Sequence, residues 1–231
     1  MAHDQQTEFI VILKRHLPDY FAESRVLEIG ALDINGSVRT LFHSCAYFGV
    51  DLDEGLGVDL VRPGQMVDLP SGSFDCTISV ECFEHNPFWL ETFVNMLRMT
   101  REDGLVVMTC ATIGRREHGT ARSSPEASPL TAARGWTYYR NLTERDFTTR
   151  LNLRNWLSDW RFFVAHESYD LYFVGLRAGP RQLRLDSHLV LDMRRRFNPL
   201  YSFRAFKRFF KVMLFGNFWS SPLSYYFRGK R

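Results

Sequence analysis

The chain has 231 residues, of which 45% are hydrophobic and 24% are charged. This length and composition suit a globular domain with a sizeable core and an appendage, and they exclude a chain that is disordered throughout. The net charge of +3 hides an asymmetry. Residues 193–231 carry ten Lys or Arg and no Asp or Glu, whereas residues 1–192 carry 19 Lys or Arg and 26 Asp or Glu. We therefore expect one domain over residues 1–180 and a basic, aromatic, helical extension over residues 181–231.

Three features favour a cytoplasmic protein. Asp4 and Glu8 precede the first apolar run, which is not the pattern of a signal peptide, and no apolar stretch approaches the ~18–20 residues of a spanning helix. The four cysteines form no CxxC pair; they are Cys45, Cys76, Cys82 and Cys110. We expect free thiols in a reducing compartment and no metal site.

Hydrophobic periodicity predicts strands alternating with helices along residues 4–177. The predicted helices cover residues 4–17, 37–43, 88–101 and 143–159, and the predicted strands cover residues 25–30, 46–51, 57–61, 74–80, 105–111, 161–166 and 171–177. Most of these strands are continuous apolar runs, which are typical of a parallel sheet covered on both faces. A tight connection joins the last two, so the expected fold is α/β, with a Rossmann-like, mostly parallel, seven-stranded sheet that ends in an antiparallel hairpin.

A long loop over residues 112–142, rich in Gly, Ser, Pro and Arg, follows the fifth strand. A loop of this length at the carboxyl edge of a sheet favours a substrate lid. Its arginines and the aromatic residues after them suit a phosphorylated or sugar-bearing acceptor; they are Arg115, Arg116, Arg122, Arg134, Trp136, Tyr138 and Tyr139. A solvated basic loop with aromatic residues in the core explains the same composition.

Two features of the first two strands predict a nucleoside site. The first strand ends at Glu28-Ile29-Gly30, and a turn then leads to a predicted helix start near Gly36-Ser37, where free backbone N–H groups face a ligand. Asp51 ends the second strand about 20 residues later, where a carboxylate can accept hydrogen bonds from two ribose hydroxyls. Strand–glycine–helix turns are common in α/β proteins, and an aspartate that caps a loop explains Asp51 equally well.

Five motifs together resemble the class I S-adenosylmethionine-dependent methyltransferases, in the family's order and spacing over residues 24–177. The motifs are Val26-Leu-Glu-Ile-Gly30, Phe48-Gly-Val-Asp51, Asp68-Leu-Pro-Ser-Gly-Ser-Phe-Asp75, Ser79-Val-Glu-Cys-Phe-Glu-His85 and Glu102-Asp-Gly-Leu105. The chain looks like the methyltransferase type 11 group, and its Asn-Gly turn is similar to that of enzymes from bacterial cell-surface glycan pathways. The terminal hairpin favours this family over dehydrogenases, whose Rossmann sheets are usually all parallel.

The resemblance implies a set of residues that bind S-adenosylmethionine. Glu28 and Gly30 would face the methionine end, Asp51 the ribose, Gln65 and Met66 the adenine, and Val80 and Glu81 the sulfonium. The family's GxGxG pattern is broken, because Leu32 and Ile34 stand where glycines are usual and Asn35-Gly36 would supply the turn instead. The helix that usually lies between the second and third strands is nearly absent.

The resemblance also implies methyl transfer, an in-line displacement that needs alignment, exclusion of water and removal of a proton from the acceptor. His118 and His85 are the candidate bases, with His118 the better one. A bracing hydrogen bond for His85, or a loop-ordering role for His118, would explain these residues without catalysis. We expect O-methylation of a sugar or lipid-linked saccharide; the alternatives are another small-molecule acceptor and a non-catalytic protein that binds the cofactor.

The basic extension contains twelve Phe, Tyr or Trp among residues 193–231. Over residues 200–215 one helical face carries Arg204, Lys207, Arg208 and Lys211, and another carries Phe203, Phe206, Phe210 and Met213. This pattern fits a helix lying on an anionic membrane surface at the inner face, and equally a helix packed on the catalytic domain or on a second copy in a homodimer. Single-stranded nucleic acid is a weaker alternative, and we expect no such partner.

Overall fold

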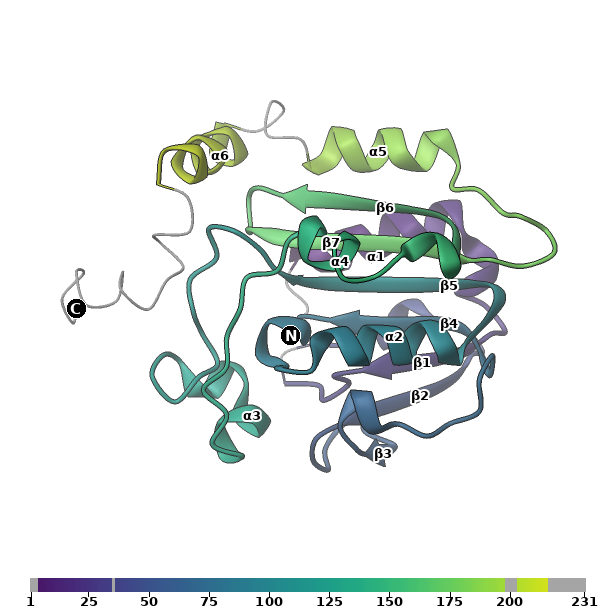
Figure 1. The fold of residues 1–231 in the computed structure, drawn as a ribbon, viewed down its shortest axis with the longest axis horizontal. Helices are drawn as coiled ribbons and strands as arrows, with labels where there is room; N and C mark the ends of the chain where they lie inside the picture. The colour runs from purple at the N-terminus through teal and green to yellow at the C-terminus, as the bar shows by residue number, and fades with distance from the viewer. Residues whose placement is uncertain (1–3, 35, 198–202, 216–231) are drawn as a thin grey trace.

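The computed structural model describes residues 4–34, 36–197 and 203–215. Its strands form one seven-stranded sheet in the order β3-β2-β1-β4-β5-β7-β6 (Figure 1). They are β1 (Arg25–Ile29), β2 (Ala46–Asp51), β3 (Leu60–Val61), β4 (Phe74–Val80), β5 (Thr100–Ala111), β6 (Leu157–Ala165) and β7 (Asp170–Arg177). β1 to β5 pair in parallel, and β7 pairs antiparallel with both β5 and β6. The expected fold class is therefore confirmed.

Helices cover both faces of the sheet. They are α1 (Asp4–His16), α2 (Trp89–Met99), α3 (Pro129–Ala133), α4 (Glu144–Thr148), α5 (Ser187–Phe197) and α6 (Phe203–Phe215). α1 and α5 pack on one face, where Phe9 stacks on Tyr172 with ring centroids 4.6 Å apart. α2 and α4 pack on the opposite face, where Phe93 meets Phe173 edge to face (Figure 1). β7 is apolar from Leu171 to Leu176, and its alternate residues enter the two cores.

Two predicted helices are much shorter in the structure. The helix expected over residues 37–43 is a four-residue 3₁₀ helix, Val38–Leu41, capped by Ser37 Oγ. It stops because Phe42 is extended and Ser44 adopts a left-handed conformation just before β2 begins. The helix expected over residues 143–159 is only α4, because pairing with β7 draws the chain from Leu157 onward into β6.

The C-terminal segment is partly integrated into the core. Leu189 and Met193 of α5 are fully buried against α1, and Arg196 donates to Glu8 at 2.6 Å. α6 packs on the β6–β7 turn, where the rings of Phe209 and His166 lie 5.1 Å apart. The boundary at residue 180 stays a prediction. None of the described helices has the length and apolar character required to cross a membrane.

Candidate functional site

A pocket lies at the carboxyl ends of the parallel strands. α3 and the long loop lie at the same end of these strands (Figure 1). Its floor comes from the ends of β1, β2 and β4, and its wall comes from residues 127–131 and Trp136 of the loop. The loop that the sequence marks as a lid therefore borders the predicted nucleoside site. Arg134 of this loop donates to the backbone oxygen of Leu52, beside Asp51, and so connects the wall to the end of β2.

The turn after β1 requires glycine. Gly30 has φ +82°, and a Cβ built on it would lie 2.7 Å from the Cβ of Cys82, in the segment that follows β4. A side chain at this position would be strained by the backbone conformation and would collide with Cys82, so only glycine fits here. Gly30 thus brings the ends of β1 and β4 together at the floor of the pocket.

Asp51 occupies the position expected of a ribose ligand. Its Oδ2 accepts the backbone N–H of Leu32 at 2.9 Å, and its Oδ1 accepts that of Leu52 at 2.7 Å. Burial raises the pKa of Asp51 above its usual value, while the two backbone donors oppose that shift. A carboxylate has about four acceptor positions, so two remain for hydroxyl groups in the pocket.

The predicted cofactor residues divide between two adjoining cavities. Gly30, Asp51, Gln65 and Glu81 line the main pocket, together with His85. Glu28, Gly36 and Val80 line a smaller cavity that shares Gly30 and Leu32 with it. Met66 is 58% exposed and lines neither cavity. Asn35 lies outside the described residues.

Glu28 is a buried acid with one polar neighbour. Tyr47 donates its hydroxyl to Glu28 Oε2 at 2.8 Å. Burial raises the pKa of Glu28 to about 7, although the hydrogen bond from Tyr47 lowers it in part. Near neutral pH the carboxyl is therefore divided between its protonated and ionised forms, and a nearby cation would favour ionisation.

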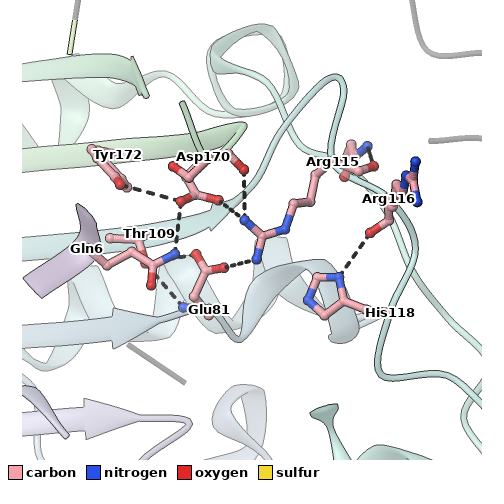
Figure 2. A network of polar contacts seen from close by, with 10 residues as sticks. Gln6, Glu81, Thr109, Arg115, Arg116, His118, Asp170 and Tyr172 are labelled. Carbon is pink, nitrogen blue, oxygen red and sulfur yellow. Dashed lines mark hydrogen bonds and ion pairs between the residues drawn. The ribbon is translucent and has the colours of Figure 1, made fainter. Parts of the chain in front are cut away.

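A partly buried guanidinium connects the end of β4 to the start of β7. Arg115 lies between two carboxylates, 3.8 Å from Glu81 and 3.1 Å from Asp170 (Figure 2). Gln6 of α1 donates to the other oxygen of Asp170 at 2.9 Å, and Thr109 donates to Glu81 at 3.2 Å. Arg115 is thus engaged inside the protein, which corrects its interpretation as a lid residue for an acceptor phosphate.

Two other lid arginines also make contacts within the chain. Arg122 pairs with Glu117 at 3.0 Å, and Arg134 makes the contact with Leu52 described above. Sequence reasoning did not find Gln6 or Asp170. The one available signal was a charged residue at the start of an otherwise apolar strand, Asp170 before Leu171–Leu176.

The two candidate bases lie together. The rings of His85 and His118 pack edge to face with centroids 5.0 Å apart, and Tyr139 contacts both at 5.4 and 5.1 Å. Burial lowers the pKa of His85 to about 3, with His118 adding to the effect, so His85 is neutral at physiological pH. His118 does not line the main pocket, and only His85 connects this cluster to it.

The fold matches solved methyltransferases. Phosphoethanolamine N-methyltransferase 2 of Haemonchus contortus, in complex with S-adenosyl-L-methionine, has a TM-score of 0.53 at 15% identity, over 74% of this chain and 52% of that chain. The 1,6-didemethyltoxoflavin-N1-methyltransferase of Burkholderia thailandensis, with bound S-adenosylhomocysteine, has a TM-score of 0.51 at 17% identity, over 76% of this chain and 80% of that chain. The protein has a class I methyltransferase fold.

These likenesses concern the fold. A carbon methyltransferase, CurJ, has a TM-score of 0.53 at 16% identity, over 76% of this chain and 55% of that chain. The chain thus spans about half the length of the Haemonchus and CurJ proteins. No protein-family model matches the chain, and no curated protein matches it significantly. The comparisons do not extend to the expected similarity to glycan-pathway enzymes.

Glu28 should make the folding stability fall as pH rises. Its pKa is about 7 in the folded chain against an ordinary value of 4.5, so the folded state binds the proton more tightly. This contribution to stability is complete below about pH 4.5 and is lost as pH rises to about 7, a loss on the order of 3 kcal/mol. Urea unfolding of Glu28→Gln and of the natural chain at pH 5 and pH 8 measures it.

Glu28→Gln should lose less stability than the natural chain over this interval, because glutamine does not titrate. Glu54→Gln, which replaces an exposed carboxylate in the loop after β2, is the matched control and should follow the natural chain. Parallel pH profiles for Glu28→Gln and the natural chain would contradict the assignment.

Proposed function

We propose that the protein is an enzyme that transfers a methyl group from S-adenosylmethionine to a small acceptor. The observation that carries the proposal is the Asp51 carboxylate, held at the end of β2 in the pocket beside the Gly30 turn. The fold supports it, because neighbours of the same fold were crystallised with S-adenosylmethionine or S-adenosylhomocysteine. In open α/β sheets, ligands bind outside the carboxyl ends of the strands.

The donor would extend across both cavities. In this proposal Asp51 accepts hydrogen bonds from the ribose hydroxyls, and Gln65, on the same pocket wall, reaches the adenine amino group. The methionine end lies in the smaller cavity, where the Glu28 carboxylate faces the donor's ammonium group. Val80 and Glu81 border the sulfonium, while Met66 and Asn35 remain predicted contacts without structural support.

Asp51→Asn should weaken donor binding. Hydrogen bonds to a charged group contribute about 1.5–3 kcal/mol, so the dissociation constant for S-adenosylmethionine should rise at least about tenfold. Isothermal titration calorimetry measures the change. Asp53→Asn removes the same charge from an exposed position two residues away and should leave the affinity unaltered. Equal affinities of the two variants would refute the assignment of Asp51.

A non-catalytic protein of this fold is the alternative. It would bind the donor without turnover or lack affinity for it, and the absence of the usual glycine pattern at Leu32 and Ile34 keeps this open. A dehydrogenase would bind NAD in the same crevice. Parallel titrations with S-adenosylmethionine, S-adenosylhomocysteine and NAD separate these classes before any acceptor is known.

For the acceptor we propose an alcohol, carried by a sugar or a lipid-linked saccharide. Trp136 on the loop wall supports this, because an aromatic face in a pocket can stack on a sugar ring. His118 supports the removal of a hydroxyl proton: its Nδ1 lies 3.0 Å from the backbone oxygen of Arg116, an atom that only accepts, so Nδ1 donates and Nε2 is the nitrogen that would take the proton (Figure 2). The neighbours, which are N- and C-methyltransferases by name, do not indicate the acceptor atom.

His118→Ala should lower turnover at saturating acceptor by about 100-fold or more while the affinity for the donor stays the same, because general-base catalysis contributes ~10²–10⁴-fold. Turnover is followed by the formation of S-adenosylhomocysteine with candidate saccharides. His188→Ala, an exposed histidine on α5, is the control. Unchanged turnover of His118→Ala would remove His118 from the mechanism.

We propose further that α6 lies on an anionic membrane surface, at the inner face of a cytoplasmic membrane. Ala205, Phe209 and Arg208 contact the β6–β7 hairpin or are buried, but the apolar face that points away from it is exposed. That face consists of Phe203, Phe206, Phe210, Met213 and Leu214. The ten Lys or Arg and the lack of acidic residues over 193–231 favour an anionic lipid surface over a second copy of this equally basic segment.

The full-length protein should co-sediment with vesicles that contain phosphatidylglycerol at low salt, and added salt should release it, because screening weakens the attraction of its basic residues. Phe206→Ser and Phe210→Ser on α6 should reduce binding to the vesicles. Leu56→Ser, at an exposed apolar position in the loop after β2, should not. Failure to co-sediment at low salt would rule the membrane out, and a stable dimer in sedimentation velocity would indicate a second copy on this face.

A further inference from the structure

Three side chains with metal-ligating atoms meet beside the main pocket. Glu84 and His85 belong to a 3₁₀ helix, Phe83–His85, that follows β4, and His118 comes from the long loop. One ligand atom from each lies within 4.8 Å of those of the other two. A carboxylate and two imidazoles from separate segments are thus brought to one place by the fold.

The ligand atoms of two of these residues are buried and have no hydrogen-bond partner among the described residues. They are both carboxylate oxygens of Glu84 and Nδ1 of His85. Glu84 is 0% exposed and His85 is 5% exposed. A buried carboxylate without a partner is costly, so native structures almost always supply a donor, a water or a cation.

The surrounding protein supplies too little positive charge. Glu84 and Asp170 are buried, the side chain of Glu81 is 5% exposed, and Arg115 is the only guanidinium among the described residues that pairs with any of them. That guanidinium already contacts Glu81 and Asp170, which leaves Glu84 without an ion pair. Further orphaned oxygens in Tyr139 and Asn141 mark the same polar region.

The third side chain, His118, makes a hydrogen bond that is typical of metal-binding imidazoles. Its Nδ1–H donates to the Arg116 backbone oxygen at 3.0 Å, which turns the lone pair of Nε2 toward other groups (Figure 2). Imidazoles that bind metals in proteins usually donate the opposite N–H to such a carbonyl. The contact of Nδ1 with this carbonyl leaves the opposite ring nitrogen as the ligand atom that His118 would offer.

We propose that Glu84, His85 and His118 bind a divalent transition-metal ion of the zinc type. Two nitrogens and one carboxylate oxygen suit Zn²⁺ or Co²⁺ better than Mg²⁺ or Ca²⁺, which prefer oxygen ligands throughout. Three protein ligands leave a coordination position open, and one of the three, His85, lines the main pocket. Metal–ligand bonds of about 2 Å require the three donors to draw closer, and His118 is carried by a loop rather than by the sheet.

The proposal differs from the expectation from sequence, which was that the chain has no metal site. That expectation rested on the cysteines, whereas this cluster uses none and joins residues 33 positions apart in the chain, His85 and His118. It does not depend on the proposed methyl transfer, because metal binding is measured without donor or acceptor. With an ion in place, His118 would be a ligand and would not itself serve as the base for the acceptor's proton.

The test begins with full-length protein treated with a chelator and then titrated with Zn²⁺ by calorimetry and with Co²⁺ by visible absorption. One ion per chain is expected, together with cobalt d–d bands typical of nitrogen ligation. An excess of Mg²⁺ should not displace either ion. The absence of stoichiometric binding, or displacement by Mg²⁺, would overturn the proposal.

Two variants locate the ion. Glu84→Gln keeps the size of the side chain and removes the charge, and His118→Ala removes the loop ligand. Each should weaken binding by more than about 100-fold, beyond the ~10–100-fold typical of an outer-shell partner. His188→Ala is the matched control for surface histidines and should bind as the natural chain does.

Folding is checked separately from binding. Glu84→Gln should be at least as stable as the metal-free natural chain, because it removes a buried charge without a partner, but Zn²⁺ should no longer raise its Tm. If His118→Ala does not fold, the metal affinity of Glu84→Gln alone tests the site. Binding retained by a folded Glu84→Gln, or lost only in His188→Ala, would show that the ion sits elsewhere and would refute the site.

Discussion

The pairing of the partly buried Arg115 guanidinium with Glu81 and Asp170 is the interaction on which the rest of the site depends. It joins three segments of different origin: the end of a parallel strand, the start of the antiparallel hairpin and the first turn of the long loop. Gln6 donates a further hydrogen bond to Asp170, and Thr109 donates one to Glu81. Removing one partner of a buried ion pair leaves the other charge uncompensated, so the loop cannot leave this position without a large energetic cost.

The position of the loop then determines the shape of the pocket. From Arg115 the chain passes His118, which packs on His85 and Tyr139, and it continues to the segment that faces Asp51 and Gly30. Asn141 donates to the Arg115 backbone oxygen at 2.9 Å, so the loop also returns to its starting point. One wall of the proposed donor site is thus supported by the same contacts that hold the two histidines in place.

Buried acidic side chains outnumber the basic ones that pair with them at this edge of the sheet. Glu28, Glu81 and Glu84 are buried acids whose pKa values are raised, in each case mainly by burial. Arg115 compensates part of this charge. A cationic donor, with its ammonium and sulfonium groups, and a bound metal ion would each add positive charge where buried carboxylates collect. The two proposals therefore concern the same edge of the sheet, but they rest on different residues within it.

The amino-acid sequence by itself determined the layered architecture, because apolar runs and their periods depend only on neighbouring residues. The strands around Glu28 and Asp51, the Gly30 turn and the terminal hairpin were all predicted in this way. It was insufficient where distant segments pair, as when residues from Leu157 onward, predicted to belong in part to a helix, join β7 as strand β6.

Only the tertiary structure decided the partners of the polar groups. Arg115 looked like a free lid residue in the sequence, and its pairing with Asp170 spans 55 positions. The contact of Glu84 and His85 with His118 depends equally on how the loop folds back over β4. Burial and charge pairing are properties of the packed chain, and no local pattern of residues encodes which distant side chain will meet a given carboxylate.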